Sequence, residues 1–260
     1  MGKRLNTQWT VTPRPNPRAA LRLICVPDAG GGIATFRGWS ERVPTAEVSV
    51  VQLPGRGSRL REPLLESAVI AADRIVESLA SVPAHPTVLF GHGIGALIAF
   101  EAARRLEYLH WPILALFVSG RRGPAIPDSA PRLSDLPLDE FVTEILARDE
   151  LVPAAAMTDP EQLQLLMPAL RADLAMTDNY RYQSGSPLRC PIVACGGTGD
   201  AGASRADMEA WKMETRGRFS LHTFAGGHAY LQREQEALTA LVANQLSVMV
   251  GAMARWAAAR

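Results

Sequence analysis

A glycine-rich turn at residues 91–95, with the sequence GHGIG, is the first feature of this sequence suited to chemistry. It stands between a short apolar run and a helical pattern. This is the layout of a nucleophile elbow, G-x-S-x-G, in which a sharp strand-to-helix turn exposes a serine hydroxyl. Gly93 occupies the position of that serine. The sequence therefore predicts the geometry of an elbow without its nucleophile.

An aspartate and a histidine follow the elbow, each just after a later apolar run. Asp200 comes after the run at 191–196, and His228 comes after the run at 219–224. Alone, Asp200 would be read as a turn former and His228 as an ordinary surface or core residue. The order elbow, acid, histidine is the one that the α/β-hydrolase fold requires. We therefore expect Asp200 and His228 to meet beside the elbow as parts of one catalytic group.

A second glycine-rich turn, VPDAGGGIATF at 26–36, follows the first apolar run. Its backbone N–H groups could stabilise the oxyanion of an acyl-transfer intermediate. We assign the N–H groups of Ala29 and Ile94 to this oxyanion hole. Asp28 lies in the same turn, which faces the active site in this fold. It is either a second acid or base, or a residue that only stabilises the turn.

Six short apolar runs bounded by glycine or proline have the character of buried strands. They span 21–26, 48–53, 87–90, 113–119, 191–196 and 219–224. Helical patterns at 68–82, 95–106, 205–214 and 232–249 separate them. Continuous apolar strands that alternate with helices predict a mostly parallel, doubly wound α/β sheet. We expect one domain over residues 1–260.

One interval breaks this alternation. The 71 residues from 120 to 190 contain no good strand, but they contain helical stretches at 138–147 and 161–182. A structureless loop of that length is implausible within a compact domain. We predict a helical insertion at about 121–190 that covers the site and excludes water as a lid.

Composition excludes several classes of protein. The 260 residues carry 27 basic and 26 acidic side chains, so no charge excess favours nucleic acid or an anionic membrane. No run approaches the length needed to cross a bilayer, and the N-terminus forms a polar arm without the apolar core of a secretion signal. Three cysteines, Cys25, Cys190 and Cys195, make a poor disulfide framework and favour the cytoplasm. No spacing indicates a metal site or a nucleotide cofactor.

With these residues in view, the chain resembles the type II, or editing, thioesterases of polyketide and nonribosomal-peptide assembly lines, from about residue 22 to 246. The resemblance rests on PDAGGG at 27–32, where the family usually has an aromatic in place of Asp28, and on the elbow. It also rests on VQLPGRGSRLREP at 51–63, SGRRGP at 119–124, LSDLPLDEF at 133–141, MPALRAD at 167–173, NYRY at 179–182 and FAGGHAYL at 224–231. It implies a small acyl substrate delivered as a thioester on the phosphopantetheine of an acyl or peptidyl carrier protein, with no other cofactor. It also implies that His228 acts as a base and that Asp200 orients its imidazole.

Gly93 leaves three interpretations open. The glycine is an engineered inactivating change, or the chain has diverged to a serine-independent reaction, or it binds carrier proteins without catalysis. Divergence would leave His228 and Asp200 to move protons in an elimination, cyclisation or isomerisation, with Asp28 as a further acid or base. The space left by the missing serine side chain at Gly93 could then admit a water molecule or a substrate group. Neither Cys25 nor Ser119 lies at an elbow, so neither is expected to replace the serine. His92 is expected to pack behind the turn.

Overall fold

The computed structural model describes residues 9–127, 131–146 and 160–258. Its centre is a seven-stranded sheet in the order β1-β3-β2-β4-β5-β6-β7. The strands are β1 (Thr10–Val11), β2 (Leu21–Val26), β3 (Ala46–Val51), β4 (Thr87–His92), β5 (Ile113–Ser119), β6 (Ile192–Gly197) and β7 (Phe219–Phe224). Strands β2 to β7 pair in parallel, and β1 pairs antiparallel with β3.

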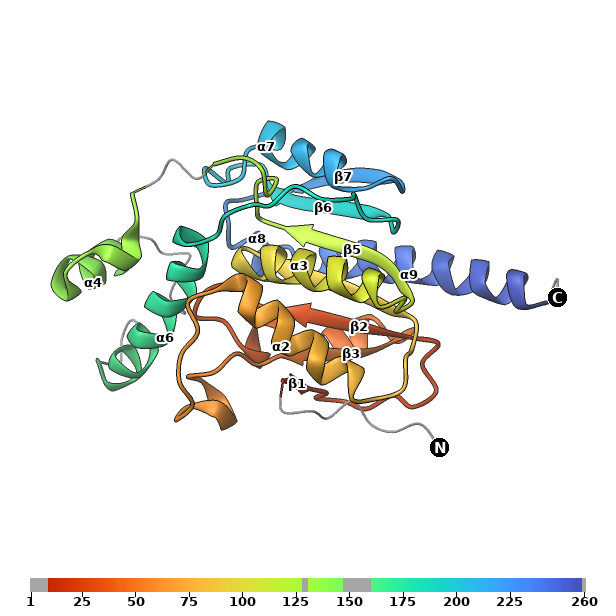
Figure 1. The fold of residues 1–260 in the computed structure, drawn as a ribbon, viewed down its shortest axis with the longest axis horizontal. Helices are drawn as coiled ribbons and strands as arrows, with labels where there is room; N and C mark the ends of the chain where they lie inside the picture. Colours follow the sequence, from red (N-terminus) through yellow and green to blue (C-terminus); the bar gives the residue numbers. More distant parts are fainter. Residues whose placement is uncertain (1–8, 128–130, 147–159, 259–260) are drawn as a thin grey trace.

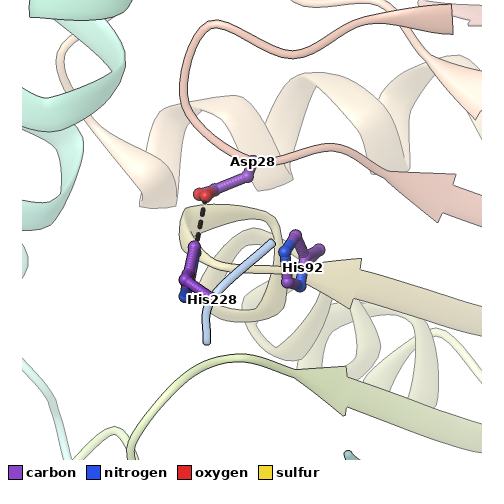
Figure 2. A group of neighbouring side chains, drawn as sticks. All are labelled: Asp28, His92 and His228. Atoms are coloured by element: carbon purple, nitrogen blue, oxygen red, sulfur yellow. Dashed lines mark hydrogen bonds and ion pairs between the residues drawn. The ribbon is translucent and has the colours of Figure 1, made fainter. Parts of the chain in front are cut away.

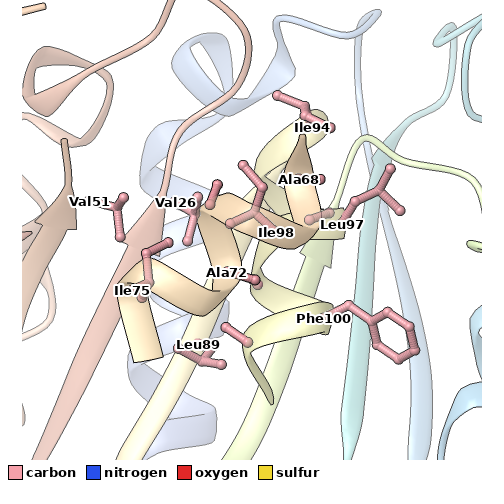
Figure 3. Packing of buried hydrophobic residues seen from close by; sticks show 14 of the residues in the cluster. Val26, Val51, Ala68, Ala72, Ile75, Leu89, Ile94, Leu97, Ile98 and Phe100 are labelled. Atoms are coloured by element: carbon pink, nitrogen blue, oxygen red, sulfur yellow. The ribbon is translucent and has the colours of Figure 1, made fainter. Parts of the chain in front are cut away.

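Helices cover both faces of this sheet (Figure 1). They are α1 (Trp39–Arg42), α2 (Ala68–Ala80), α3 (Ile94–Tyr108), α4 (Leu138–Leu146), α6 (Pro160–Asp178), α7 (Arg205–Glu209), α8 (Tyr230–Arg233) and α9 (Gln235–Ala258). Strand side chains alternate between two cores. Val26 packs with α2 and α3 (Figure 3), whereas Leu23 packs with α9. The doubly wound α/β prediction is confirmed, and the six expected strands are present within two residues of their predicted bounds.

Strand β1 was not predicted, because the N-terminal segment was read as a polar arm. Thr10 pairs with Val51 and Val11 pairs with Val50, so this short edge strand extends the sheet. The neighbouring Trp9 is buried, with the Arg59 guanidinium 3.9 Å from the centre of its ring. A two-residue strand is too short to show the alternation on which sequence interpretation depends.

The interval expected to form a lid contains helices α4 and α6, as predicted. Helix α6 ends at Asp178, four residues before the predicted end, and Ala147, the last residue of the first helical stretch, lies outside the described residues. Both helices lie beyond the carboxyl ends of the strands (Figure 1). The catalytic centre of an open α/β sheet belongs at this edge. That these helices act as a lid stays a prediction.

Helix α9 is longer and more apolar than the sequence interpretation allowed. Its segment Gln235–Ala257 contains an 18-residue stretch with a mean hydropathy of 1.5 and is long enough to cross a bilayer. The expectation that no stretch meets this test was therefore wrong for α9. Its first half packs on the sheet through Leu238, Val242 and Leu246, as a core helix of a globular domain would, whereas Trp256 near its end is 61% exposed.

Candidate active site

The predicted elbow is present between β4 and α3. Strand β4 ends at His92 and α3 begins at Ile94, with Gly93 between them at φ 54° and ψ −122°. A Cβ atom at Gly95 would collide with the carbonyl oxygen of Val26, so only glycine permits this close crossing of helix and strand. The chain therefore retains the strained turn that would present a nucleophile.

Position 93 has no side chain of its own, yet the space beside it is filled. A Cβ atom at Gly93 would collide with Oδ1 and Cγ of Asp28. The sequence had suggested a notch at Gly93 that could admit a water molecule or a substrate group. The structure instead places the Asp28 carboxylate there, which corrects that expectation.

The two oxygens of this carboxylate contact different parts of the site. Oδ1 accepts a hydrogen bond from the Ile94 N–H at 2.9 Å, and the Ala29 backbone also hydrogen-bonds the carboxylate. Oδ2 lies 2.8 Å from His228 Nε2 (Figure 2). The two N–H groups predicted for the oxyanion hole therefore converge, and they converge on Asp28.

His228 and Asp200 meet as the order of motifs predicts. His228 Nδ1 lies 2.8 Å from Asp200 Oδ2, and the Gly202 N–H donates to Asp200 Oδ1 at 2.9 Å. The Asp200 side chain is almost fully buried, whereas the His228 side chain is 21% exposed. The loops after the adjacent parallel strands β6 and β7 hold the pair, because strand ends of one direction share one edge of the sheet.

The imidazole of His228 therefore lies between two carboxylates. Burial alone would lower the pKa of His228, but the hydrogen bonds and negative charges of Asp200 and Asp28 raise it to about 10. Burial likewise opposes ionisation of Asp28, yet the hydrogen bond and positive charge of His228 hold the pKa of Asp28 well below its usual range. Both shifts favour an ion-paired site, with an imidazolium between two carboxylates, in which His228 would start as a proton donor. That His228 acts as a base stays a prediction.

His92 packs behind the elbow, as expected. Its Nδ1 lies 2.9 Å from Ser119 Oγ, which in turn lies 2.5 Å from the Tyr230 hydroxyl. Burial and the nearby positive charge of His228 lower the pKa of His92 to about 4, so this ring is neutral. Ser119 lies at the end of β5 beside the elbow, where its carbonyl accepts from the Gly93 N–H at 2.9 Å, but it is not itself an elbow residue. Cys25 is buried within β2, and burial raises the pKa of its thiol.

Asp28, His92 and His228 are also the described residues best placed to hold a metal ion, with donor atoms within 4.8 Å of one another. However, the two imidazole rings stack with centres 4.8 Å apart and planes 23° apart. Nitrogen lone pairs lie in the plane of the ring, so those of two stacked rings run side by side instead of converging on one ion. As arranged, the cluster fits an ion-paired acid–base group better than a metal centre.

Comparison with known proteins decides the family. The family model described as "Thioesterase domain" matches residues 21–246. The chain belongs to the thioesterase family. It is 34% identical over 245 residues to the gramicidin S biosynthesis protein GrsT of Aneurinibacillus migulanus, covering 94% of this chain and 95% of that protein. It is 35% identical over 251 residues to thioesterase PikA5 of Streptomyces venezuelae, covering 94% and 87%.

Solved structures of thioesterases show the same fold. The type II thioesterase BorB from the borrelidin biosynthetic cluster has a TM-score of 0.85 and 35% identity, covering 92% of this chain and 97% of BorB. The type II thioesterase YbtT from the yersiniabactin pathway has a TM-score of 0.82 and 26% identity, covering 93% and 99%. The resemblance to type II thioesterases and the α/β-hydrolase fold are thereby confirmed, and the chain is a member of a family of thioester hydrolases.

A buried ion pair braces the turn that carries Asp28 in this thioesterase. Arg56 Nη1 and Nη2 donate to Asp173 Oδ2 and Oδ1 at 2.6 and 2.7 Å. The Gly30 N–H donates to the same carboxylate at 2.8 Å, and Arg56 also donates to the Gly31 carbonyl at 3.0 Å. Sequence interpretation did not find this pair. Its only signal was that both residues fall within the blocks that resemble the family, VQLPGRGSRLREP and MPALRAD.

Proposed function

We propose that this thioesterase hydrolyses acyl thioesters carried on the phosphopantetheine of an acyl or peptidyl carrier protein, and that it does so without a serine. The observation that carries the proposal is the Asp28 carboxylate, which bridges His228 Nε2 and the Ile94 N–H beside Gly93. The relatives named above support a role in polyketide or nonribosomal-peptide biosynthesis. Three free, buried cysteines support a reducing, cytoplasmic setting.

The fit between positions 28 and 93 supports a natural departure from serine catalysis. A serine at 93 could not coexist with Asp28 in its present place, because their atoms would overlap. If engineering had simply replaced a serine at position 93, we would not expect Asp28 to contact both the oxyanion donors and His228. The pairing of a small residue at 93 with a carboxylate at 28 favours a site that functions as it stands.

Protonated His228 suits thioester cleavage. The leaving group is a thiolate, and His228 can donate its Nε2 proton to the departing sulfur. Asp200 keeps the ring oriented through Nδ1 while that proton moves. After donation the ring is neutral, and it can then accept a proton from water.

The test is thiol release from acyl-carrier and acyl-cysteamine thioesters by the chain as it stands. We expect turnover that His228→Asn lowers at least a hundredfold, since this change removes the proton donor. His110→Asn is the matched control, because His110 is exposed and has a positive φ that asparagine tolerates. No thiol release from either substrate, or an undiminished rate in His228→Asn, would contradict the proposal.

A second candidate is elimination, cyclisation or isomerisation of the acyl chain with the thioester left intact. It is favoured by the imidazolium and the carboxylate 2.8 Å apart, which can give and take a proton on one substrate. Mass spectrometry of the carrier-bound product separates the two reactions. Hydrolysis frees the thiol, elimination removes water from the chain, and isomerisation leaves the mass unchanged. A protein that only binds would form a complex with the carrier protein and leave the acyl chain and its thioester unchanged.

A further inference from the structure

The Asp28 carboxylate has the two contacts that a covalent nucleophile needs. One oxygen, Oδ1, is held by the oxyanion donor Ile94 N–H at 2.9 Å, and the other, Oδ2, faces His228 Nε2 at 2.8 Å. The carboxylate occupies the space that a serine side chain at position 93 would need. Its side chain is 19% exposed, so it is partly open to solvent at the carboxyl edge of the sheet.

We propose that Asp28 is the nucleophile of this thioesterase and forms an acyl-aspartyl anhydride during turnover. The inference rests on the proposed thioester hydrolysis and names the group that attacks. Carboxylates serve as covalent nucleophiles in other hydrolytic enzymes. A carboxylate is a weak nucleophile, but here it is fixed beside the proton donor, and such positioning lowers the barrier.

In the first step, Asp28 Oδ2 attacks the thioester carbonyl carbon and the carbon–sulfur bond breaks. The departing sulfur takes the Nε2 proton of His228, which leaves a free thiol, a neutral imidazole and the mixed anhydride. No oxidant, reductant or further reactant is required. The hydrogen bond between Asp200 and His228 Nδ1 persists throughout.

In the second step, neutral His228 removes a proton from water and the hydroxide adds to Cγ of Asp28. Negative charge develops on Oδ1, where the Ile94 N–H already donates, so the oxyanion hole acts on the enzyme's own carboxylate. The bond between Cγ and Oδ2 then breaks, and the acyl group leaves as a carboxylate that keeps Oδ2. Asp28 is left as an acid and loses its proton to solvent. The sum is thioester plus water giving carboxylic acid plus thiol.

A single turnover of an acyl-cysteamine thioester in water enriched in ¹⁸O tests this route. We expect the label in the peptide that contains Asp28 and not in the released acid. Quenching the unaltered chain during turnover should reveal an acyl adduct on that peptide, detected by intact and peptide mass. His228→Asn lacks the proton donor of the first step and the base of the second, so it should show neither label nor adduct. Asp28→Asn and Asp28→Ala should abolish label and adduct and lower turnover about 10³-fold or more.

The outcomes separate this inference from the proposed function. Thiol release with neither label nor adduct at Asp28 would overturn the nucleophile and leave thioester hydrolysis standing. Unchanged or faster turnover in Asp28→Ala would show that the carboxylate only obstructs the site, and would also overturn it. No thiol release at all would overturn both. Asp135→Asn, an exposed carboxylate on the 3₁₀ turn Leu133–Asp135, is the control that should retain full activity.

Discussion

At the scale of single residues, the site is defined by the mutual exclusion of two side chains. Serine at 93 and aspartate at 28 compete for one volume, so this chain has the carboxylate and lacks the hydroxyl. Both departures from the family pattern, Gly93 and Asp28, were evident from the sequence, but each of them was considered separately. Their dependence on each other became visible only when the side-chain position of Asp28 was known, because a motif does not specify a rotamer.

Restoring serine alone should therefore fail. We expect Gly93→Ser to gain no serine reactivity, because its Cβ would collide with Asp28. Combining it with Asp28→Phe should free both the oxyanion donors and His228 Nε2. Stoichiometric labelling by a fluorophosphonate and thioester turnover measure the outcome.

The reference for the double variant is Asp28→Phe alone, which has neither a serine at position 93 nor the Asp28 carboxylate. The double variant should turn over at least about a hundredfold faster than that variant, so the two changes should be strongly non-additive. Full fluorophosphonate labelling of Gly93→Ser by itself would show that Asp28 moves aside easily, against this account.

The pH dependence should also differ from that of a serine triad. A serine enzyme requires a neutral histidine, so its rate rises as that histidine deprotonates. In the proposed reaction protonated His228 is the active form, and Asp200 and Asp28 raise its pKa to about 10. We expect kcat/KM to stay flat from about pH 6 to 9 and to fall as the pH approaches 10.

Nuclear magnetic resonance of the His228 ring gives a direct check on that profile. Asp28→Asn removes one of the two carboxylates, so the pKa of His228 should fall toward its ordinary value of about 6.5. A pKa near 6.5 for His228 in the unaltered chain would refute the ion-paired site.

At the scale of elements, the sequence predicted what depends on local pattern and missed what depends on distant contacts. The parallel strands were found because buried strands read as continuous apolar runs. Asp200 and His228 were found because loops after parallel strands share one edge. Strand β1 was too short to show a pattern, and the Arg56–Asp173 pair joins positions 117 residues apart. No short sequence pattern predicts a contact between residues so far apart in the chain.

That pair offers a test of how helix α6 supports the active-site turn. Asp173 is buried and Arg56 nearly so, so Arg56→Met leaves a buried carboxylate without its countercharge. We expect a loss of about 3 kcal/mol or more in the free energy of unfolding, or roughly 10 °C in Tm. Turnover should fall as well, because the Gly30 and Gly31 backbone next to Asp28 loses its brace.

Adding Asp173→Asn to Arg56→Met should recover part of the stability, since it removes the uncompensated charge. Arg74→Met is the control: the Arg74–Glu77 pair is more than half exposed, and its loss should cost under about 1 kcal/mol. Equal losses in Arg56→Met and Arg74→Met would show that the buried pair braces nothing.

At the scale of the whole molecule, six parallel strands gather every proposed catalytic group at one edge. Asp28, Asp200 and His228 lie in the loops after β2, β6 and β7, and Ile94 begins α3 directly after β4. The sheet therefore fixes their mutual distances, and a family sequence can exchange serine for a carboxylate without a change of fold. The same ionised cluster also links the folded state of the entire domain to pH.

The stability of the domain should consequently fall on the alkaline side. The pKa of His228 is about 10 when folded and about 6.5 when unfolded, so the folded chain binds more protons between these values. Its contribution is complete below about pH 6.5 and is lost as the pH rises toward 10, at up to about 1.4 kcal/mol per pH unit. Asp28 and Asp200 have lowered pKa values, so their contribution is present above about pH 4 and is lost on acidification.

Urea unfolding at pH 6, 8 and 9.5 measures how the free energy of unfolding changes with pH on the alkaline side. His228→Asn should be less stable than the unaltered chain at pH 6, and the difference should shrink by pH 9.5, because only the unaltered chain has that proton to lose. A constant difference across this range would show that His228 does not fold as an imidazolium.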